Sequence, residues 1–250
     1  MSGGYGSNSL AEALGRKSLL LKSLLKALYP PMPTLNIMEQ SRIDAIQGCL
    51  FRSGATVINI GSGGLTGCGY RLWENGAIRS ASVYNMDILA SDGVSLVGDA
   101  HSLPFQDNSI DSLIYQAVLE HVQDPRRVID EATRVLKPGG YLYLEVPFLQ
   151  GFHADPHDYQ RYTLEGLRIR TNLLTEIDAG VSVGPFCALV WIIRDGVSSC
   201  FSNRFLYAAS RFIAGWALSP LRYFDHLIKN NPASKRLACE YYMLCQKAES

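Results

Sequence analysis

The stretch Val57-Ile58-Asn59-Ile60-Gly61-Ser62-Gly63-Gly64 decides the fold class of this 250-residue chain. Its first half is a short, β-branched apolar run that ends at glycine, which is typical of a buried strand in a parallel sheet. Glycine has no Cβ, so the backbone that follows can turn tightly and approach a ligand closely. A strand, a glycine turn and a helix together form the geometry with which open α/β sheets hold nucleotide-like ligands. Taken alone, the pattern is equally compatible with a purely structural turn.

The composition narrows the class of protein. The 23 basic and 23 acidic residues balance, which argues against a nucleic-acid partner, because nucleic-acid binders usually carry a basic excess. The six scattered cysteines lack a Cys-x-x-Cys pair, which favours reduced thiols and a cytoplasmic location. The chain begins without a secretory-signal pattern, and its longest apolar run, from Val183, stops at Arg194 and is too short to span a membrane.

Strand and helix signals alternate outward from the glycine turn. The helix that begins at Asp124-Pro125 is well marked, since Asp caps free N–H groups and Pro suits the first helical position; it ends at Pro138-Gly139-Gly140. This alternation predicts an α/β fold with a doubly wound, Rossmann-like, mostly parallel sheet. The first five strands are expected at Thr56–Ile60, Ala81–Met86, Val94–Val97, Ser109–Tyr115 and Tyr141–Val146.

Other segments flank this core. Residues 1–52 are predicted to form an N-terminal disordered tail and helices, and residues 53–250 the main domain, with a helical insertion at about 185–232. The remaining predicted elements are helices at Leu10–Leu28, Ile37–Phe51, Thr163–Asn172 and within Ala188–Lys229, a strand at Leu174–Val183 and a last strand at Leu237–Lys247.

Acidic residues stand at the ends of the second and third predicted strands. Asp87 follows strand two and Asp99 follows strand three. Because the carboxyl ends of parallel strands meet at one crevice, both acids are expected beside the glycine turn. An acid after strand two can accept hydrogen bonds from both ribose hydroxyls, and one after strand three can bind the amine of adenine. A single Asp would be an ordinary loop residue, but the ordered set predicts a nucleotide-type site.

Four further segments resemble the class I S-adenosylmethionine-dependent methyltransferases. In order, they are Gly98-Asp99-Ala100-His101-Ser102-Leu103-Pro104-Phe105, Ile110-Asp111-Ser112-Leu113-Ile114-Tyr115, Val118-Leu119-Glu120-His121-Val122 and Arg134-Val135-Leu136-Lys137-Pro138-Gly139-Gly140. The resemblance runs from about Thr56 to Phe148 and is closest to the branch with G-D-A-x-x-L-P-F and L-E-H-V segments. It implies S-adenosylmethionine as cofactor and a seven-stranded sheet with an antiparallel last strand.

The resemblance also implies roles for individual residues. Asp87 would hold the ribose of the cofactor, and Gln116 would lie beside its methionine portion. The residues of the glycine turn that would lie near the amino acid part of the cofactor are Gly61, Ser62 and Gly63. The residues that would border the adenine are Asp99, Ala100 and His101.

Two positions depart from the family pattern. Asn59 stands where the family usually has an acid, and Leu65 where it has a third spaced glycine. Asn accepts a hydrogen bond but brings no negative charge for the ammonium group of the cofactor. The departures leave weak cofactor binding open, although neither removes a residue that methyl transfer itself needs.

A polar loop follows the fifth predicted strand, at residues 151–163. Methyl transfer is mainly a matter of alignment, and a hydroxyl acceptor also needs a general base. We predict that His153 or His157 faces the acceptor, one of them as the base, and that Tyr159 and Arg161 bind the substrate.

An alternative interpretation of the same loop is structural. In it Asp158 pairs with Arg161, Thr163 caps the next helix, and the histidines are polar loop residues. His153-x-Asp155-x-His157 also has the residue types of a metal site, but no Cys or further His lies nearby in sequence, so no metal is predicted. By the resemblance, His121 helps to shape the floor of the cofactor pocket.

The stretch 188–229 interleaves aromatic residues with arginines. Residues 183–237 carry seven Lys or Arg and two Asp, a net charge of +5 (7 − 2). Such a segment can contact a membrane surface peripherally, cover the substrate as a lid, or form a dimer face. Ordinary packing is the favoured interpretation.

The sequence thus favours a methyltransferase that uses S-adenosylmethionine to modify a small-molecule or lipid-linked acceptor, with a sugar hydroxyl as one candidate. A nicotinamide-binding Rossmann protein is disfavoured, because G-x-G-x-x-G is missing. A third interpretation is a non-catalytic, methyltransferase-like subunit that binds cofactor poorly and works through its C-terminal helices, for example at a membrane surface.

Overall fold

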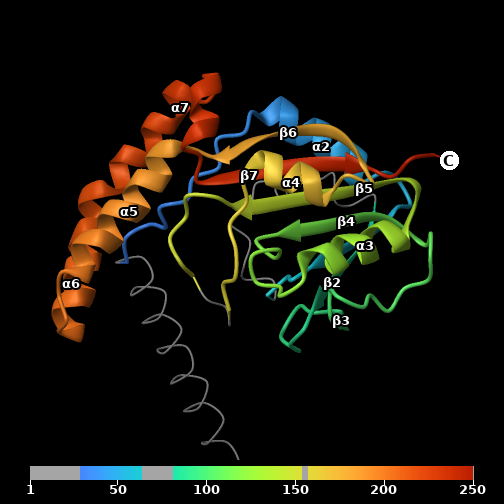
Figure 1. The fold of residues 1–250 in the computed structure, drawn as a ribbon, viewed down its shortest axis with the longest axis horizontal. Helices are drawn as coiled ribbons and strands as arrows, with labels where there is room; N and C mark the ends of the chain where they lie inside the picture. Colours follow the sequence, from blue (N-terminus) through green and yellow to red (C-terminus); the bar gives the residue numbers. More distant parts are fainter. Residues whose placement is uncertain (1–28, 64–80, 154–156, 250) are drawn as a thin grey trace, which may run out of the picture.

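The computed structural model describes residues 29–63, 81–153 and 157–249. The predicted tail and the helix at Leu10–Leu28 lie outside these residues. The elements in chain order are α2 (Gln40–Leu50), β1 (Thr56–Ile60), β2 (Ser82–Asp87), β3 (Leu96–Val97), β4 (Ile110–Gln116), α3 (Pro125–Val135), β5 (Leu136–Pro147), α4 (Leu164–Arg170), β6 (Thr175–Val183), α5 (Pro185–Ser199), α6 (Arg204–Leu218), η4 (Ser219–Phe224), α7 (Asp225–Ile228), η5 (Pro232–Arg236) and β7 (Glu240–Gln246) (Figure 1).

One seven-stranded sheet organises the chain, in the order β3-β2-β1-β4-β5-β7-β6. The pairs along β3-β2-β1-β4-β5 are all parallel. Strand β7 lies between β5 and β6 and is antiparallel to both. The predicted Rossmann-like sheet with an antiparallel last strand is therefore confirmed.

Helices cover both faces of the sheet, because successive strand residues point to opposite sides. On one face, α3 and α4 pack on a cluster that includes Leu113, Tyr115 and Leu144. On the other, α2 packs on a cluster that includes Ile114 and Tyr143. The central strands are thus buried on both sides, which explains their nearly continuous apolar sequence.

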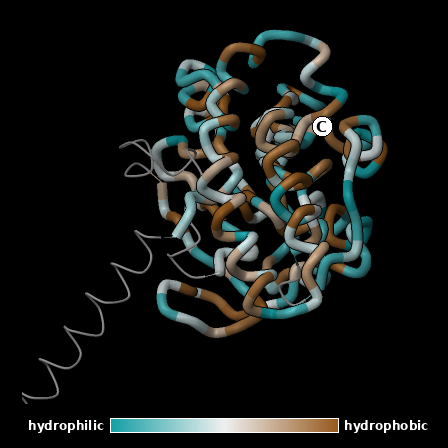
Figure 2. Tube along the Cα trace, turned by 90° about the vertical axis from the view of Figure 1, so that its left-hand side faces the viewer, coloured by the Kyte–Doolittle hydropathy of each residue, from teal (hydrophilic) through white to brown (hydrophobic). Residues whose placement is uncertain are grey.

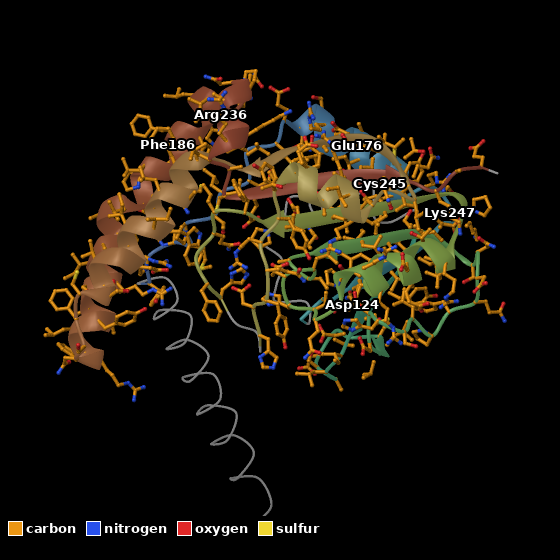
Figure 3. All side chains as sticks on the ribbon, viewed as in Figure 1. Asp124, Glu176, Phe186, Arg236, Cys245 and Lys247 are labelled. Atoms are coloured by element: carbon orange, nitrogen blue, oxygen red, sulfur yellow. The ribbon has the colours of Figure 1, made fainter. Side chains whose placement is uncertain are left out.

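Helix α3 begins and ends at the signals that the sequence contains. The Asp124 side chain accepts a hydrogen bond from the Arg127 N–H, and Pro125 occupies the first turn. At the other end, the Lys247 ammonium donates to the carbonyls of Thr133 and Leu136 at 2.6 and 2.8 Å. Asp124 and Lys247 lie at opposite ends of this helix in Figure 3. Both contacts satisfy terminal backbone groups and complement the helix dipole.

Two strands differ in length from the prediction. Strand β5 begins at Leu136 rather than at Tyr141, since Leu136 already pairs with Ile110 and the Gly139 N–H donates to the Lys247 carbonyl at 3.0 Å. Strand β3 is reduced to Leu96–Val97. Turns, bends and irregular backbone occupy residues 88–95, so no helix connects β2 to β3.

The helical insertion between β6 and β7 stands beyond the carboxyl ends of β4, β5 and β6, whose arrowheads point toward α5 and α6 (Figure 1). The buried Asp225 carboxylate anchors this insertion, because it accepts hydrogen bonds from the N–H groups of Phe186 and Cys187 at 2.8 and 2.9 Å. Phe186 marks the start of α5 in Figure 3. Helix α5 also contributes Trp191 to a small core with Val183 and Cys239. The insertion is therefore tied to the same sheet edge as the crevice.

Candidate active site

The glycine turn follows β1 directly. Gly61 and Gly63 have φ values of +66° and +56°, a left-handed conformation that favours glycine. A Cβ on Gly61 would come within 2.6 Å of Val118 Cγ2. Ser62 Oγ is buried and has no hydrogen-bond partner among the described residues. The turn thus presents backbone and a free hydroxyl at the carboxyl edge of the sheet. Gly64 and Leu65 lie outside the described residues.

Asp87 lies beside this turn, as the alignment of strand ends predicts. Its carboxylate accepts hydrogen bonds from the Gly63 N–H at 2.8 Å and the Leu89 N–H at 3.1 Å. The side chain is only partly buried, so the carboxylate retains acceptor capacity toward a ligand. The Asn59 side chain points toward the neighbouring strand β2, where its amide donates to Asn85 Oδ1 at 3.0 Å.

Asp99 and His101 form a compact group after β3. The Asp99 carboxylate accepts from the His101 N–H at 2.9 Å and lies 2.7 Å from His101 Nδ1. Burial raises the pKa of Asp99, but the hydrogen bonds from His101 lower it more, so the net pKa is below its ordinary value. The His101 carbonyl accepts from Arg127 Nε at 2.8 Å, and Ala100 between them is buried. These contacts fix the loop in place beside α3.

Gln116 ends β4 and is buried against β5. Its amide donates to Glu145 Oε2 at 2.6 Å, and the Asn36 amide donates to Glu145 Oε1 at 3.3 Å. Burial raises the pKa of Glu145 to about 7, even though the hydrogen bond from Gln116 opposes the shift. Part of the hydrogen-bonding capacity of Gln116 is therefore used inside the protein.

The structural interpretation of the polar loop holds for three of its residues. The Arg161 guanidinium donates to Asp158 Oδ2 at 2.6 Å and to the Gly151 carbonyl at 3.1 Å. Thr163 caps α4 by accepting from the Gly166 N–H at 3.0 Å. Arg161 therefore holds the loop together. The exposed Tyr159 ring lies against His157, with 5.4 Å between ring centroids. Asp155 lies outside the described residues.

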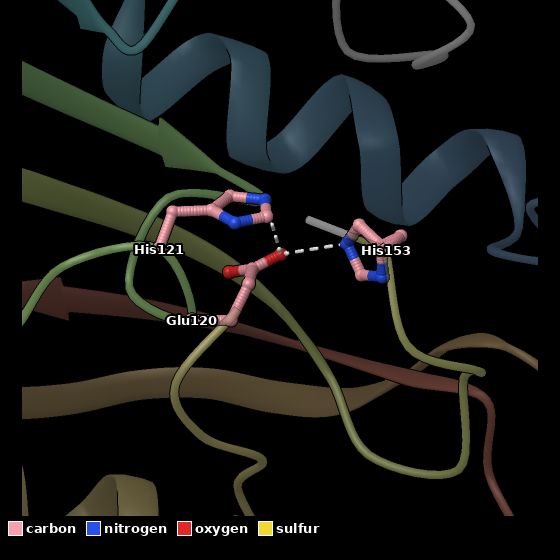
Figure 4. A group of neighbouring side chains, drawn as sticks. All are labelled: Glu120, His121 and His153. Carbon is pink, nitrogen blue, oxygen red and sulfur yellow. Dashed lines mark ion pairs between the residues drawn. The ribbon is translucent and has the colours of Figure 1, made fainter. Parts of the chain in front are cut away.

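The fold brings His153 to the L-E-H-V segment (Figure 4). Glu120 Oε1 lies 3.5 Å from His153 Nε2 and 3.8 Å from His121 Nε2. The Glu120 carboxylate is fully buried and raises the pKa of His153 above its usual value, against the opposing effect of burial. We name Glu120, His121 and His153 the EHH cluster. His157 lies outside it, although its carbonyl accepts a hydrogen bond from His121 Nδ1.

Sequence reasoning missed Glu120 and assigned His121 to the pocket floor. The two segments meet because the Tyr159 N–H donates to the Glu120 carbonyl at 2.8 Å and the Gln160 amide donates to the Val122 carbonyl at 3.1 Å. The sequence offered one signal for this site, a Glu next to a His in a segment that follows a strand end. That signal does not indicate which loop would lie against Glu120.

Comparison with known proteins identifies a family for the central part of the chain. Residues 59–144 match the family model described as "Methyltransferase domain". That range includes the glycine turn, Asp87, Asp99, Gln116 and Glu120.

Similar curated proteins include a 37.1 kDa protein in transposon TN4556 of Streptomyces fradiae, 31% identical over 52% of this chain and 42% of the relative. A demethylmenaquinone methyltransferase of Thermotoga maritima is 34% identical over 32% of this chain and 45% of the relative. The 2-methyl-6-phytyl-1,4-hydroquinone methyltransferase 1 of Oryza sativa subsp. japonica is 33% identical over 47% of this chain and 40% of the relative. The chain thus spans less than half the length of these relatives.

Among solved structures, the [4+2]-cyclase SpnF has a TM-score of 0.55 and 16% identity, with 95% of this chain and 96% of that chain covered. At this identity the likeness shows the fold alone, and a shared fold does not fix the reaction.

Proposed function

Because the chain contains a class I S-adenosylmethionine-dependent methyltransferase domain, we propose that it transfers a methyl group to a small-molecule or lipid-linked acceptor, with a sugar hydroxyl as one candidate. The observation that carries this proposal is the order of the glycine turn, Asp87 and Asp99 at the ends of β1, β2 and β3. Two relatives are named for demethylmenaquinone and a phytyl hydroquinone. These names support an acceptor with an apolar chain.

The residues at the crevice fit the cofactor. The buried hydroxyl of Ser62, which has no partner in the described part of the chain, and the left-handed turn at Gly61 and Gly63 offer a close approach to the amino acid part. Asp87 would hold the ribose. Asp99, Ala100 and His101 would border the adenine, and Gln116 and Asn59 would lie toward the methionine portion. S-adenosylmethionine supplies a methyl group that is already activated on a sulfonium, so this chain has to align the acceptor and exclude water.

His157 is the better candidate for the general base. Both ring nitrogens of His153 face protein groups, since Nδ1 lies 3.0 Å from the Gly151 carbonyl and Nε2 lies 3.5 Å from Glu120. His157 is exposed beside Tyr159, so its imidazole can reach an acceptor hydroxyl at the same sheet edge. Of the two predicted histidines, His157 then takes the proton of the acceptor hydroxyl. His153 holds the loop that faces the acceptor in place through its contact with Glu120 in the EHH cluster.

The test is calorimetry of the full chain with S-adenosylmethionine and S-adenosylhomocysteine, followed by a screen of sugar and hydroquinone acceptors with labelled cofactor. We expect saturable binding of both ligands and labelled product. His157→Ala should lower turnover about 10²- to 10⁴-fold, the usual contribution of a general base, and should leave cofactor affinity unchanged. His226→Ala, at another exposed histidine, is the matched control. Failure to bind either ligand would favour the non-catalytic subunit, and unchanged turnover in His157→Ala would remove its catalytic role.

The helical insertion supports a second proposal, peripheral membrane contact through residues 188–229. No helix in the described part of the chain is long and apolar enough to cross a bilayer. On α6, however, Phe205, Ile213 and Trp216 are 78%, 67% and 45% exposed at roughly helical spacing. Figure 2 views this side of the molecule and shows hydrophobic and hydrophilic segments interleaved on it. Exposed apolar residues on a basic segment suit an anionic interface.

Co-sedimentation with vesicles that contain anionic lipid tests this second proposal. We expect the full chain to bind and Phe205→Glu with Ile213→Glu to lose most of the bound fraction. Ile169→Glu is the control, because Ile169 is equally exposed, at 72%, but lies on α4. Equal binding of both variants, or no binding of the wild-type chain, would contradict membrane contact through α6.

A further inference from the structure

Glu120 is an unusual residue in this fold, because its carboxylate is fully buried and neither oxygen accepts a hydrogen bond from any described residue. Burying a carboxylate is costly unless a positive charge, hydrogen-bond donors or a metal compensate. The nearest candidate partners are the Nε2 atoms of His153 and His121, at 3.5 and 3.8 Å. Both distances exceed those of a well-formed charge-assisted hydrogen bond.

The two imidazoles are held by their opposite nitrogens. His121 Nδ1 contacts the His157 carbonyl, and His153 Nδ1 lies 3.0 Å from the Gly151 carbonyl. Each Nδ1 therefore lies at a carbonyl acceptor, and each Nε2 is the ring atom that faces Glu120. Metal-binding histidines show this pattern, in which one nitrogen donates to a backbone carbonyl and the other ligates.

The spacing of the three groups fits a first-row divalent ion. One atom from each of Glu120, His121 and His153 lies within 4.8 Å of the other two. Ligands at about 2.0–2.2 Å from a tetrahedral Zn²⁺ are roughly 3.4 Å apart, which is close to the 3.5 and 3.8 Å between Glu120 Oε1 and the two Nε2 atoms. The ring centroids of His121 and His153 are 5.2 Å apart, and the two ring planes are nearly perpendicular. Two imidazoles that bind one ion at adjacent positions can adopt this arrangement.

Charged groups around the cluster do not oppose a cation. Arg161 Nη2 lies 3.4 Å from His153 Nδ1, on the side away from Glu120, and Asp158 neutralises this guanidinium. The buried Glu240 is close enough to Glu120 for the two carboxylates to interact unfavourably. A divalent ion at Glu120 would relieve that repulsion.

We propose that Glu120, His121 and His153 bind one divalent transition-metal ion, Zn²⁺ being the expected one, at the carboxyl edge of the sheet. The sequence predicted no metal, because Glu120 and His121 are far along the chain from His153. Three protein ligands leave coordination positions open, which is typical of catalytic rather than structural zinc sites. The role of the ion rests on the proposed function: it would bind the acceptor hydroxyl and lower its pKa, and the released proton would pass to His157.

The experiment uses the full chain after chelation and dialysis, titrated with Co²⁺ and followed by visible absorption, with Zn²⁺ added as competitor. We expect one Co²⁺ per chain, displaced by Zn²⁺, and a higher melting temperature with Zn²⁺. Glu120→Gln and His153→Ala should each weaken binding by more than the 10- to 100-fold typical of losing an outer-shell partner. His226→Ala should bind like the wild-type chain.

A lack of Co²⁺ absorption in the folded wild-type chain would overturn the proposal, and so would Co²⁺ binding as tight as that of the wild type in Glu120→Gln and His153→Ala. Glu120→Gln also separates a metal site from a structural ion pair. It removes a buried charge, so the metal-free variant should melt no lower than the wild type, while its Zn²⁺-induced rise is lost. S-adenosylhomocysteine binding, measured on the same samples, tests the cofactor site separately, so failure of the metal proposal and failure of the methyltransferase proposal can be told apart.

Discussion

Asp87→Ala is expected to weaken binding of S-adenosylhomocysteine about 100-fold or more. The carboxylate accepts hydrogen bonds from the N–H groups of Gly63 and Leu89, so it both shapes the glycine turn and is available to the ribose hydroxyls. A hydrogen bond to a charged group contributes about 1.5–3 kcal/mol, and two such bonds to ribose would account for the loss. Calorimetry of wild type and variant at one ionic strength measures it.

Two further variants keep this result interpretable. Asp92→Ala removes an exposed Asp from the same β2–β3 connection and should bind like the wild type. Asp87→Asn retains an acceptor oxygen without the charge and should fall between wild type and Asp87→Ala. If Asp87→Ala is folded by thermal melting and binds with unchanged affinity, Asp87 does not hold the ribose.

Glu145→Gln is expected to stabilise the chain at pH 8 by up to about 3 kcal/mol relative to its effect at pH 4.5. The pKa of Glu145 is about 7 in the fold, against 4.5 for an ordinary Glu. Between these values the unfolded chain has lost the proton and the folded chain keeps it. The free energy of unfolding therefore falls by about 1.4 kcal/mol per pH unit as pH rises from 4.5 to 7. Above pH 7 it levels off. Gln is neutral throughout and removes this fall.

Denaturant unfolding at pH 4.5, 6 and 8 measures the difference between the two proteins. The pH dependence is the diagnostic quantity, since Gln also changes the contact with the Asn36 amide by a pH-independent amount. Glu165→Gln, at an exposed site on α4, should change stability by less than about 1 kcal/mol at each pH. A Glu145→Gln stabilisation that does not grow with pH would show that Glu145 ionises normally in the fold.

Local signals predicted much of the fold because they act over a few residues. Asp124-Pro125 marks the start of α3, and the apolar run before Gly61 marks β1. The start of β5 could not be predicted in the same way. Pro138-Gly139-Gly140 indicates a helix end, but its pairing with Lys247 depends on a strand far along the chain. Tertiary contacts of this kind override local propensity.

The candidate site shows the same division. The glycine turn, Asp87 and Asp99 follow strand ends, and the topology of a parallel sheet brings such positions together. The EHH cluster depends on how the polar loop after β5 folds back on the L-E-H-V segment, through contacts such as Tyr159 N–H to the Glu120 carbonyl. Residue spacing carries no information on that approach. For this reason His153 was predicted as a base, and its neighbour Glu120 was overlooked.

The position of β7 between β5 and β6 also matters while the ribosome makes the chain. Strand β6 emerges first, and its neighbour in the sheet is β7, which is translated only after the whole of α5 to η5. At about 5–20 residues per second, the nascent chain waits for several seconds with β6 unpaired. An unpaired edge strand is a template for association with other chains. Completion of this sheet therefore waits for insertion of β7, and chaperone demand during synthesis should be greatest in that interval.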